Sequence, residues 1–176
     1  MTWSKKINFD IDTIEYSFKE NNKYFIYATA DSFLFNSIEI NPQEIKNKIE
    51  ISLDTLLVGR KFTLFNVNFS PNSSDLRNTA NTDLERLTIF LNNNPDYFIE
   101  VQGHTNYNIF SDRNYLFDLS FKRALEIKRF LVLNGIAENR INCSGMGGSA
   151  PLIISDDQNL AMRNLRVEII LIDKYQ

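Results

Sequence analysis

The hydrophobic residues of this 176-residue chain change their spacing several times, and each spacing predicts a different element. Residues 62–69 are rich in β-branched and aromatic side chains, which is typical of a strand. Ala80, Leu84, Leu87 and Leu91 then recur every three or four residues, as one face of a helix does. Residues 97–102 alternate apolar and polar side chains and predict a second strand.

Turn and capping residues indicate where the first helix begins and ends. The polar cluster at residues 72–75 predicts its start, and Thr-Asp-Leu-Glu at residues 82–85 matches the capping-box pattern. Asn-Asn-Asn-Pro at residues 92–95 predicts its end, because proline cannot continue a helix.

A second helix is predicted over residues 116–133. Lys128 and Arg129 are expected to complement the negative C-terminal end of its dipole. Gly135 stands where a helix-ending C′ glycine belongs.

Two more strands, at residues 141–144 and 166–172, complete the pattern. From residue 60 to 173 the predicted order is therefore β-α-β-α-β-β. This order indicates an α/β sandwich in which helices pack on a mixed sheet.

Residues 1–42 have a different, all-β pattern. Ile7, Phe9 and Ile11 alternate with polar residues, and Tyr24–Ala28 is rich in strand-forming residues. An isolated two-stranded hairpin is marginally stable in water, so this segment is expected to pack on the main domain, to be completed by a partner chain, or to be a remnant. Residues 43–59 are expected to form a connector, with a short strand at 50–53.

Composition excludes some classes of function. The hydrophobic and charged fractions, 43% and 23%, are those of a globular protein. A net charge of −3 argues against nucleic-acid binding, which needs a clustered basic face. No apolar run is long enough to span a membrane, and the N-terminus lacks the apolar core of a signal peptide. The single Cys143 is expected to be buried on a strand.

Candidate chemistry gathers where the second predicted strand ends and the second helix begins. The strand ends in Gly103-His104-Thr105-Asn106, and the helix carries Leu119-Ser120-Phe121-Lys122-Arg123-Ala124. A guanidinium is a planar fork of donors that suits bidentate binding of a carboxylate. A buried helix face would also accommodate Arg123 as an arginine that packs through its aliphatic stem.

These two motifs resemble those of the OmpA-like domain, which holds the peptidoglycan wall in many Gram-negative envelope proteins. The resemblance covers about residues 60–173. It implies that Arg123 pairs with a carboxylate of the diaminopimelate residue in the wall's stem peptide. Asn106 stands where the family has an aspartate for the ligand's ammonium, and the neutral amide is expected to weaken binding by around tenfold. Alternatively, Asn106 only accommodates a turn.

The resemblance also implies supporting roles for other residues. Thr105 or Asn72 is expected to orient the ligand, and Asn114 to supply an amide from the loop at 107–115. Arg166 is included in the site, more as a support of the sheet edge than as a direct contact. The chain departs from the family at three further positions: Ser70, Leu116 and Leu165.

Glu15-Tyr16-Ser17-Phe18 and Lys23-Tyr24-Phe25-Ile26-Tyr27-Ala28 resemble hairpins of the transthyretin-like or carboxypeptidase-regulatory β-sandwiches. Such sandwiches often precede OmpA-like domains in Bacteroidetes proteins. Together with the Asn- and Ile-rich composition, this resemblance suggests a Bacteroidetes source.

The resulting hypothesis is a non-catalytic module that tethers an outer-membrane protein or lipoprotein complex to peptidoglycan, in the periplasm or at the periplasmic face of the outer membrane. The alternative is a degenerate OmpA-like fold that serves as a protein-interaction or scaffold module. No cofactor or metal is expected, since one histidine and one cysteine make no plausible ligand set. His104 is expected to be a structural hydrogen-bonding residue, and glycines 145, 147 and 148 to form a backbone bend.

Overall fold

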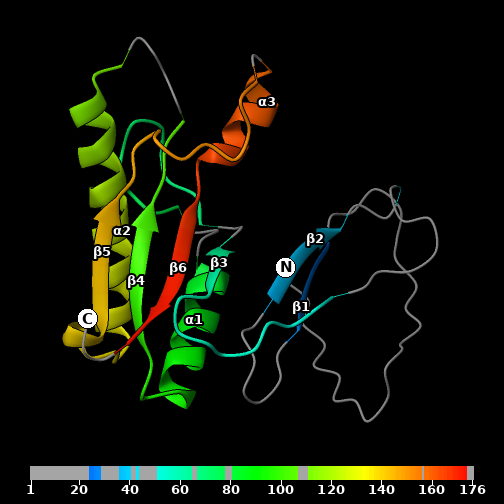
Figure 1. Cartoon of the computed structure of the whole chain (residues 1–176), viewed down its shortest axis with the longest axis vertical. Coiled ribbons are helices and arrows are strands. Elements are labelled where there is room, and N and C mark those ends of the chain that lie inside the picture. Colours follow the sequence, from blue (N-terminus) through cyan, green and yellow to red (C-terminus); the bar gives the residue numbers. More distant parts are fainter. Residues whose placement is uncertain are drawn as a thin grey trace.

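The computed structural model contains a sheet domain and a separate N-terminal pair of strands (Figure 1). Ala80 and the alternating residues at 7–11 lie outside the part that the structure describes. The described residues are 24–28, 36–40, 43, 51–64, 67–77, 81–106, 111–155 and 157–173.

The main sheet has four strands in the order β3-β6-β4-β5. β4 and β5 run parallel, whereas β6 is antiparallel to both β3 and β4, so the sheet is mixed. This confirms the predicted fold class. The strands are β3 (Lys61–Leu64), β4 (Phe98–Gly103), β5 (Ile141–Gly145) and β6 (Val167–Ile172).

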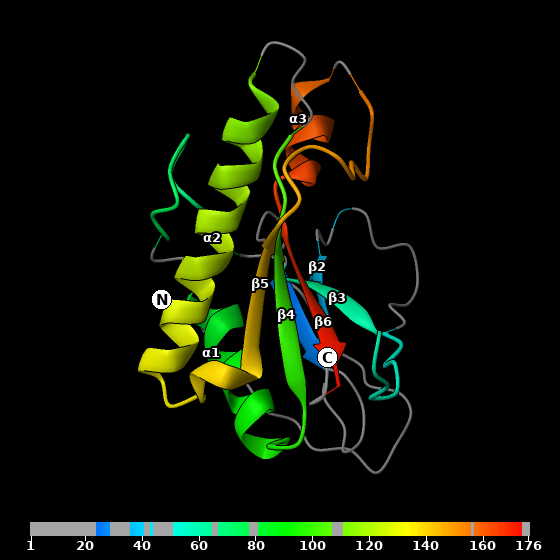
Figure 2. The ribbon, with the colours of Figure 1, turned by 60° about the vertical axis from the view of Figure 1, so that its left-hand side comes forward.

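Two long helices, α1 (Asn81–Asn93) and α2 (Arg113–Leu133), pack on the same side of this sheet (Figure 2). The short elements η3 (Glu138–Arg140), α3 (Gln158–Ala161) and η4 (Met162–Asn164) lie in its connections. The helices and the inward face of the sheet together enclose one hydrophobic core.

The predicted apolar stripes form this core. Leu84, Leu87 and Leu91 of α1 are completely buried, as their spacing predicted. On the sheet, alternate residues point into the core because side chains of a strand alternate between faces. The completely buried strand residues of this set are Ile99, Val101, Val167, Ile169 and Leu171.

The predicted start of the first helix was wrong in two respects. Residues 72–75 form a turn, in which Asn72 has φ 51° and the Ser70 amide donates to the Asp75 carbonyl at 2.9 Å. Thr82 lies inside α1 and does not precede it as a cap. The turn residues at 72–75 lie between Phe69 and Leu76, which pair in an isolated antiparallel β-bridge. The sequence pattern did not predict this pairing.

Helix α2 begins at Arg113, three residues earlier than predicted. The Asp112 carboxylate accepts hydrogen bonds from the amides of Asn114 and Tyr115, at 2.6 and 3.3 Å, and so caps the helix. The negative charge at this end also suits the helix dipole.

The end of α2 is only partly as predicted. Gly135 adopts φ 93°, which confirms its role as the C′ glycine. Lys128 and Arg129 lie before the last turn, and they bind Glu138 and Glu126 at 3.3 and 3.1 Å. The expected dipole contribution of these two residues was therefore wrong.

In the N-terminal part, β1 (Tyr24–Ala28) pairs antiparallel with β2 (Asn36–Ile40). This confirms the strand predicted at Tyr24–Ala28. Of the short strand expected at 50–53, the described residues 51–53 are irregular. The division of the chain at residues 42 and 59 stays a prediction. Among the helices in the described ranges, none has the length and apolar character that crossing a bilayer requires.

Candidate functional site

Helix α2 lies unusually close to the carboxyl ends of β4 and β5, and two glycines permit this approach. A Cβ added to Gly103 would lie 2.0 Å from the Ser120 carbonyl oxygen. A Cβ added to Gly145 would lie 2.4 Å from the Phe117 carbonyl oxygen. Only glycine fits at either position without moving the helix.

The Ser120 hydroxyl fixes the helix to the turn after β5. It donates to the Phe117 carbonyl at 2.8 Å and accepts from the Gly147 amide at 2.9 Å. Gly147 adopts φ 52°, which confirms the predicted bend at this glycine cluster. The rotation of α2 about its axis is thereby set, and with it the direction of Arg123, one turn further along.

Arg123 is buried, with only 6% of its surface exposed. Its Nε donates to the Ser73 carbonyl at 3.0 Å, and its Cζ lies 5.0 Å from the centre of the Phe69 ring. These contacts hold the guanidinium through its Nε edge and one face. Within the described residues no hydrogen bond engages the two terminal nitrogens, Nη1 and Nη2.

The charge of Arg123 is not neutralised by any carboxylate within 4.0 Å among the described residues. Burial lowers the pKa of the guanidinium, and the Tyr115 hydroxyl opposes this shift. A buried cation without a partner carries a desolvation cost that a bound anion would offset. An anion is the kind of ligand that such a group can bind.

Thr105 and Asn106 follow directly from the end of β4. The Thr105 amide donates to the Gly147 carbonyl at 2.8 Å, which links this segment to the turn that Ser120 holds. The Thr105 hydroxyl and the Asn106 Oδ1 are buried and have no hydrogen-bond partner. Buried polar atoms are rarely left unpaired, so these two atoms mark a place where a ligand or water can bind.

The other predicted site residues are placed less favourably. Asn72 and Asn114 are both exposed, Asn72 in the turn at 72–75 and Asn114 in the first turn of α2. Two other carboxylates could replace the aspartate that the family has at position 106, but both have other roles. Asp112 caps α2, and Asp118 binds Lys122 at 2.6 Å.

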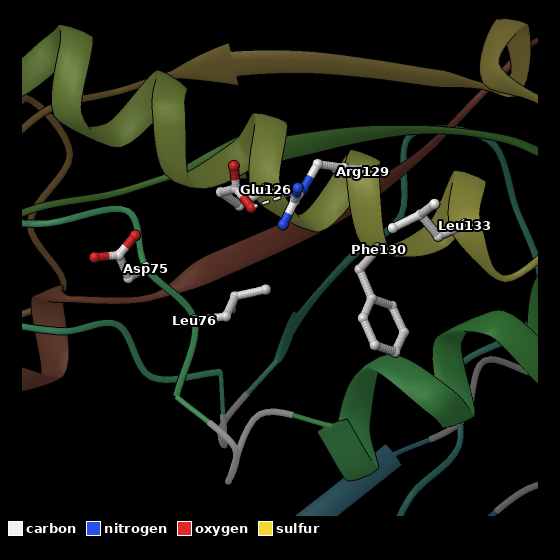
Figure 3. A pocket seen from close by; sticks show the side chains of 6 residues that line it. All are labelled: Asp75, Leu76, Glu126, Arg129, Phe130 and Leu133. Atoms are coloured by element: carbon white, nitrogen blue, oxygen red, sulfur yellow. Dashed lines mark hydrogen bonds and ion pairs between the residues drawn. The ribbon is translucent and has the colours of Figure 1, made fainter.

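A cavity of about 260 Å³ lies along α2, beyond Arg123 (Figure 3). Leu76 and the exposed Asp75 form one side of it, and the helix supplies the other side, where Glu126 and Arg129 are paired at 3.1 Å. Glu126 is three residues after Arg123 and Phe130 is seven residues after it, so both lie near the line of Arg123 along α2. The lining residues are Asp75, Leu76, Glu126, Arg129, Phe130 and Leu133.

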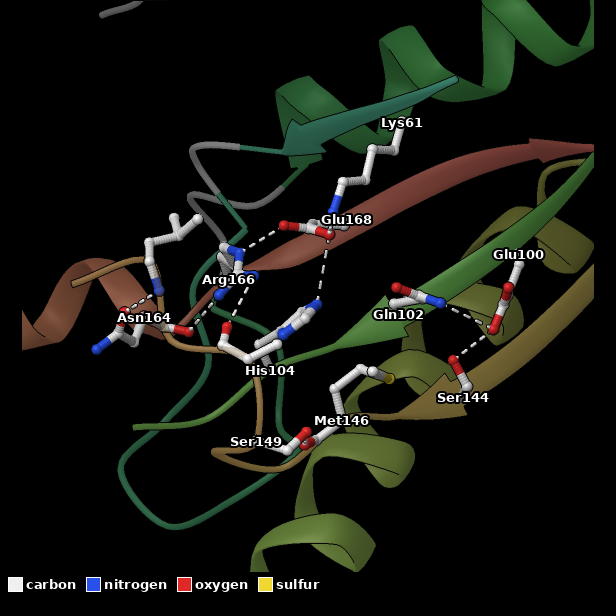
Figure 4. A network of polar contacts seen from close by, with 12 residues as sticks. Lys61, Glu100, Gln102, His104, Ser144, Met146, Ser149, Asn164, Arg166 and Glu168 are labelled. Carbon is white, nitrogen blue, oxygen red and sulfur yellow. Dashed lines mark hydrogen bonds and ion pairs between the residues drawn. The ribbon is translucent and has the colours of Figure 1, made fainter. Parts of the chain in front are cut away.

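Arg166 is part of a polar network on the sheet (Figure 4). Its Nε donates to Glu168 at 2.7 Å, Nη1 to the Asn164 carbonyl at 3.4 Å and Nη2 to the Ala150 carbonyl at 3.2 Å. Lys61 binds the same Glu168 carboxylate at 3.1 Å. Each nitrogen of Arg166 therefore has an internal partner. The expected place at the sheet edge was wrong, because Arg166 precedes β6, an inner strand that pairs with both β3 and β4.

His104 is buried beside this network, and its structural role differs from the predicted one. Neither ring nitrogen makes a hydrogen bond, and Nε2 lies 3.6 Å from the Glu168 carboxylate. Burial, followed by the charge of Arg166, lowers the pKa of His104 to about 4 from its usual 6.5. The imidazole is therefore neutral at physiological pH.

Two contacts of Arg123 were not predicted, with Phe69 and Ser73, nor was the electrostatic effect of Tyr115 on its charge. Phe69 and Ser73 lie about fifty residues before Arg123 in the chain, so sequence spacing gave no signal for them. Tyr115 could have been found, because it lies eight residues before Arg123, two turns along the same helix.

The chain is similar in sequence to known proteins. Residues 68–164 match the sequence profile of the OmpA family. A peptidoglycan-associated lipoprotein of Mesorhizobium japonicum is 33% identical over 98 residues, which are 56% of this chain and 57% of that protein. The chain thus spans a little over half the length of such relatives.

Solved structures share the fold. A MotB-like protein of Desulfovibrio vulgaris is 25% identical, with a TM-score of 0.52, over 60% of this chain and 67% of that one. The peptidoglycan-associated lipoprotein of Burkholderia pseudomallei is 23% identical, with a TM-score of 0.54, over 60% and 87% of the two chains. The second likeness concerns the fold alone.

Proposed function

Because this chain belongs to the OmpA family, we propose that it is a non-catalytic module that binds peptidoglycan and anchors an envelope protein or complex to the wall. The observation that carries the proposal is the buried guanidinium of Arg123, which has no carboxylate partner among the described residues. The names of relatives, which include peptidoglycan-associated lipoproteins, support the same conclusion.

In this proposal a carboxylate of the diaminopimelate residue in the stem peptide binds the terminal nitrogens of Arg123. The planar fork of these donors accepts a carboxylate in a bidentate pair. Asn106 and the Thr105 hydroxyl lie at the end of β4 with unpaired polar atoms and bind the neighbouring part of the ligand. Arg166 supports the strand beside them, and Asn72 and Asn114 are peripheral.

Such a module acts in the periplasm or on the periplasmic face of the outer membrane. There it meets both the wall and its other partner, an outer-membrane protein or lipoprotein complex. No reaction is proposed. Burial raises the pKa of the Cys143 thiol to about 11, so this side chain is protonated and a poor nucleophile at neutral pH.

A second candidate function is that of an interaction or scaffold module that has lost its wall ligand. The observation that favours it is the neutral side chain of Asn106 in a site where Asp112 and Asp118 are engaged elsewhere. Without a negative charge at position 106, the site can attract the carboxylate of a zwitterion through Arg123 but has no charged partner there for its ammonium group.

Co-sedimentation with diaminopimelate-type peptidoglycan sacculi tests the proposal. We expect the wild-type protein to pellet and Arg123→Ala to lose at least tenfold in affinity, because the charge-assisted pair is removed. Arg129→Ala is the matched control, since Arg129 is 71% exposed on the same helix.

Two outcomes would count against wall binding. If the wild-type protein stays in solution while Asn106→Asp pellets, the site is folded but lacks the carboxylate that wall binding needs. The interaction module is then the better description. If Arg123→Ala and Arg129→Ala pellet equally, Arg123 is not the anchor.

A further inference from the structure

The turn that holds Arg123 also carries a carboxylate. The Ser73 carbonyl accepts from Arg123 Nε at 3.0 Å, and Asp75 follows two residues later in the same turn. The Asp75 amide donates to the Ser73 hydroxyl at 2.9 Å, and the Asp75 carbonyl accepts from the Ser70 amide at 2.9 Å. Two residues of extended chain span at most about 7 Å, so Asp75 is held near the residue that binds the guanidinium.

The side chain of Asp75 is available to a ligand. It is exposed, and its carboxylate makes no ion pair or hydrogen bond with the described residues. The Asp112 and Asp118 carboxylates differ, because the first caps α2 and the second binds Lys122. Of these three acidic residues, Asp75 is the one whose charge no described residue pairs.

Asp75 also lines the cavity along α2, on the side opposite the helix (Figure 3). The other charged residues of the lining, Glu126 and Arg129, neutralise each other at 3.1 Å. The cavity is therefore left with the negative charge of Asp75. Because Glu126 comes one helical turn after Arg123, this anionic cavity adjoins the buried cation.

We infer that Asp75 binds the ammonium group of the ligand whose carboxylate Arg123 binds. The ligand is then an amino-acid end with a free amine, and its negative partner stands in the turn at 72–75 instead of at position 106. This inference rests on the proposed function, because it assigns the other half of the ligand that Arg123 holds there.

The physical reason is that a zwitterion needs a cation and an anion side by side. Its ammonium group loses strong hydration on binding, and a carboxylate offsets this loss better than a neutral acceptor does. The cavity of about 260 Å³ has room for the group and several waters, since a water takes up about 30 Å³ in the liquid. Leu76 and Phe130 offer apolar surface to neighbouring methylene groups.

N-acetylation of peptidoglycan tests this assignment, because it removes the charge of the free amines and leaves the carboxylates. Diaminopimelate-type sacculi are compared by co-sedimentation before and after treatment with acetic anhydride. We expect acetylation to lower the affinity of the wild-type protein by about five- to tenfold. Asp75→Asn should bind untreated sacculi more weakly by the same factor, and acetylation should then have no further effect.

Asp118→Asn is the matched control. Asp118 is 55% exposed on α2 in a surface ion pair, so the same change of charge should leave both the affinity and the effect of acetylation unchanged. Asp75→Glu keeps the charge and should keep the effect of acetylation. The described hydrogen bonds of Asp75 are made by its backbone, so its variants should fold, as circular dichroism can verify.

The outcomes separate this inference from the proposed function. If acetylation does not weaken wild-type binding, or weakens Asp75→Asn equally, the role of Asp75 is overturned and wall binding stands. An equal loss in Asp118→Asn would assign the effect to overall charge and would overturn that role too. If the protein pellets with neither form of the sacculi, the proposed function fails, and the inference fails with it.

Discussion

The two buried arginines of the sheet domain have opposite surroundings, although both are almost completely shielded from water. Arg166 donates from every nitrogen to a carboxylate or carbonyl within the protein. Arg123 uses only Nε and leaves its terminal nitrogens without a described partner. Removing one partner of a buried ion pair is costly because the other charge is left uncompensated, whereas a buried charge with open donors can accept a ligand.

This contrast predicts different effects of removing each arginine. Arg166→Ala leaves the buried Glu168 carboxylate with Lys61 as its one described hydrogen-bond donor and the neutral His104 ring 3.6 Å away, so we expect the free energy of unfolding to fall by roughly 2–4 kcal/mol. Urea unfolding measures it, with the exposed Arg129→Ala as a control that changes stability by less than about 0.5 kcal/mol. A loss of sacculus binding at unchanged stability would instead make Arg166 a direct ligand contact.

His104 makes stability depend on pH. Its pKa is about 4 in the folded protein against an ordinary 6.5, so between these values the unfolded chain binds the proton more readily. Stability is then complete above pH 6.5 and falls by about 3 kcal/mol as the pH drops to 4. Denaturant midpoints measured across this range should show the fall, and His104→Gln should flatten it.

Glu168 acts over a lower range of pH and can be distinguished. Its hydrogen bonds with Arg166 and Lys61 lower its pKa below the usual 4.5, against the effect of burial. The contribution of Glu168 to stability is present above pH 4.5 and is lost as the pH falls through its lowered pKa. A His104→Gln protein with an unchanged slope between pH 6.5 and 4.5 would show that another group is responsible.

At the scale of elements, the site depends on the contact between α2 and the ends of β4 and β5. Gly103 and Gly145 bring the helix against the sheet, and Ser120 fixes it to the turn at Gly147. The direction of Arg123 follows from this contact, because a helical side chain moves with its helix.

Gly103→Ala should therefore affect both stability and binding. The added methyl group would meet the Ser120 carbonyl, so we expect a loss of about 2–3 kcal/mol of stability and a loss of sacculus binding by the folded fraction. Gly135→Ala is the matched control: its methyl group has open space, and only its φ of 93° costs about 1 kcal/mol. Equal effects of the two substitutions would mean that the close approach of α2 is unimportant.

At the scale of the whole molecule, the core lies within the sheet domain. Its described buried residues run from Leu64 to Leu171, and Leu56 packs against them. The backbone before β3 also belongs to the sheet, because the Gly59 amide donates to the Leu171 carbonyl at 2.7 Å and the Leu171 amide to the Arg60 carbonyl at 2.9 Å.

A chain shortened to begin at residue 55 should therefore fold by itself. We expect its sheet domain to unfold at the same urea concentration as in the full chain. A chain that begins at residue 61 loses the Gly59 and Arg60 hydrogen bonds and the Leu56 contact, and should be less stable by about 2 kcal/mol. If the chain from residue 55 is unfolded, the N-terminal strands are an integral part of the domain.

Much of the fold could be predicted because its determinants are local. The apolar periods of α1 and of the strands follow from the geometry of single elements, and the core residues Leu84, Leu87, Ile99 and Val101 were found in this way. Helix starts were predicted less well. The cap at Asp112 and the turn at 72–75 each involve polar residues that are equally common in several kinds of turn.

The sequence by itself determined the order of elements, the buried faces, the family and the two residues Arg123 and Asn106 as candidates. The tertiary structure decided that Arg123 is buried against Ser73 and Phe69 with its terminal nitrogens unbonded to described residues. It also decided that Arg166, which is equally buried, has a partner for every nitrogen. The reason is physical: periodicity depends on neighbours within a few residues, whereas burial and charge pairing depend on segments brought together from distant parts of the chain.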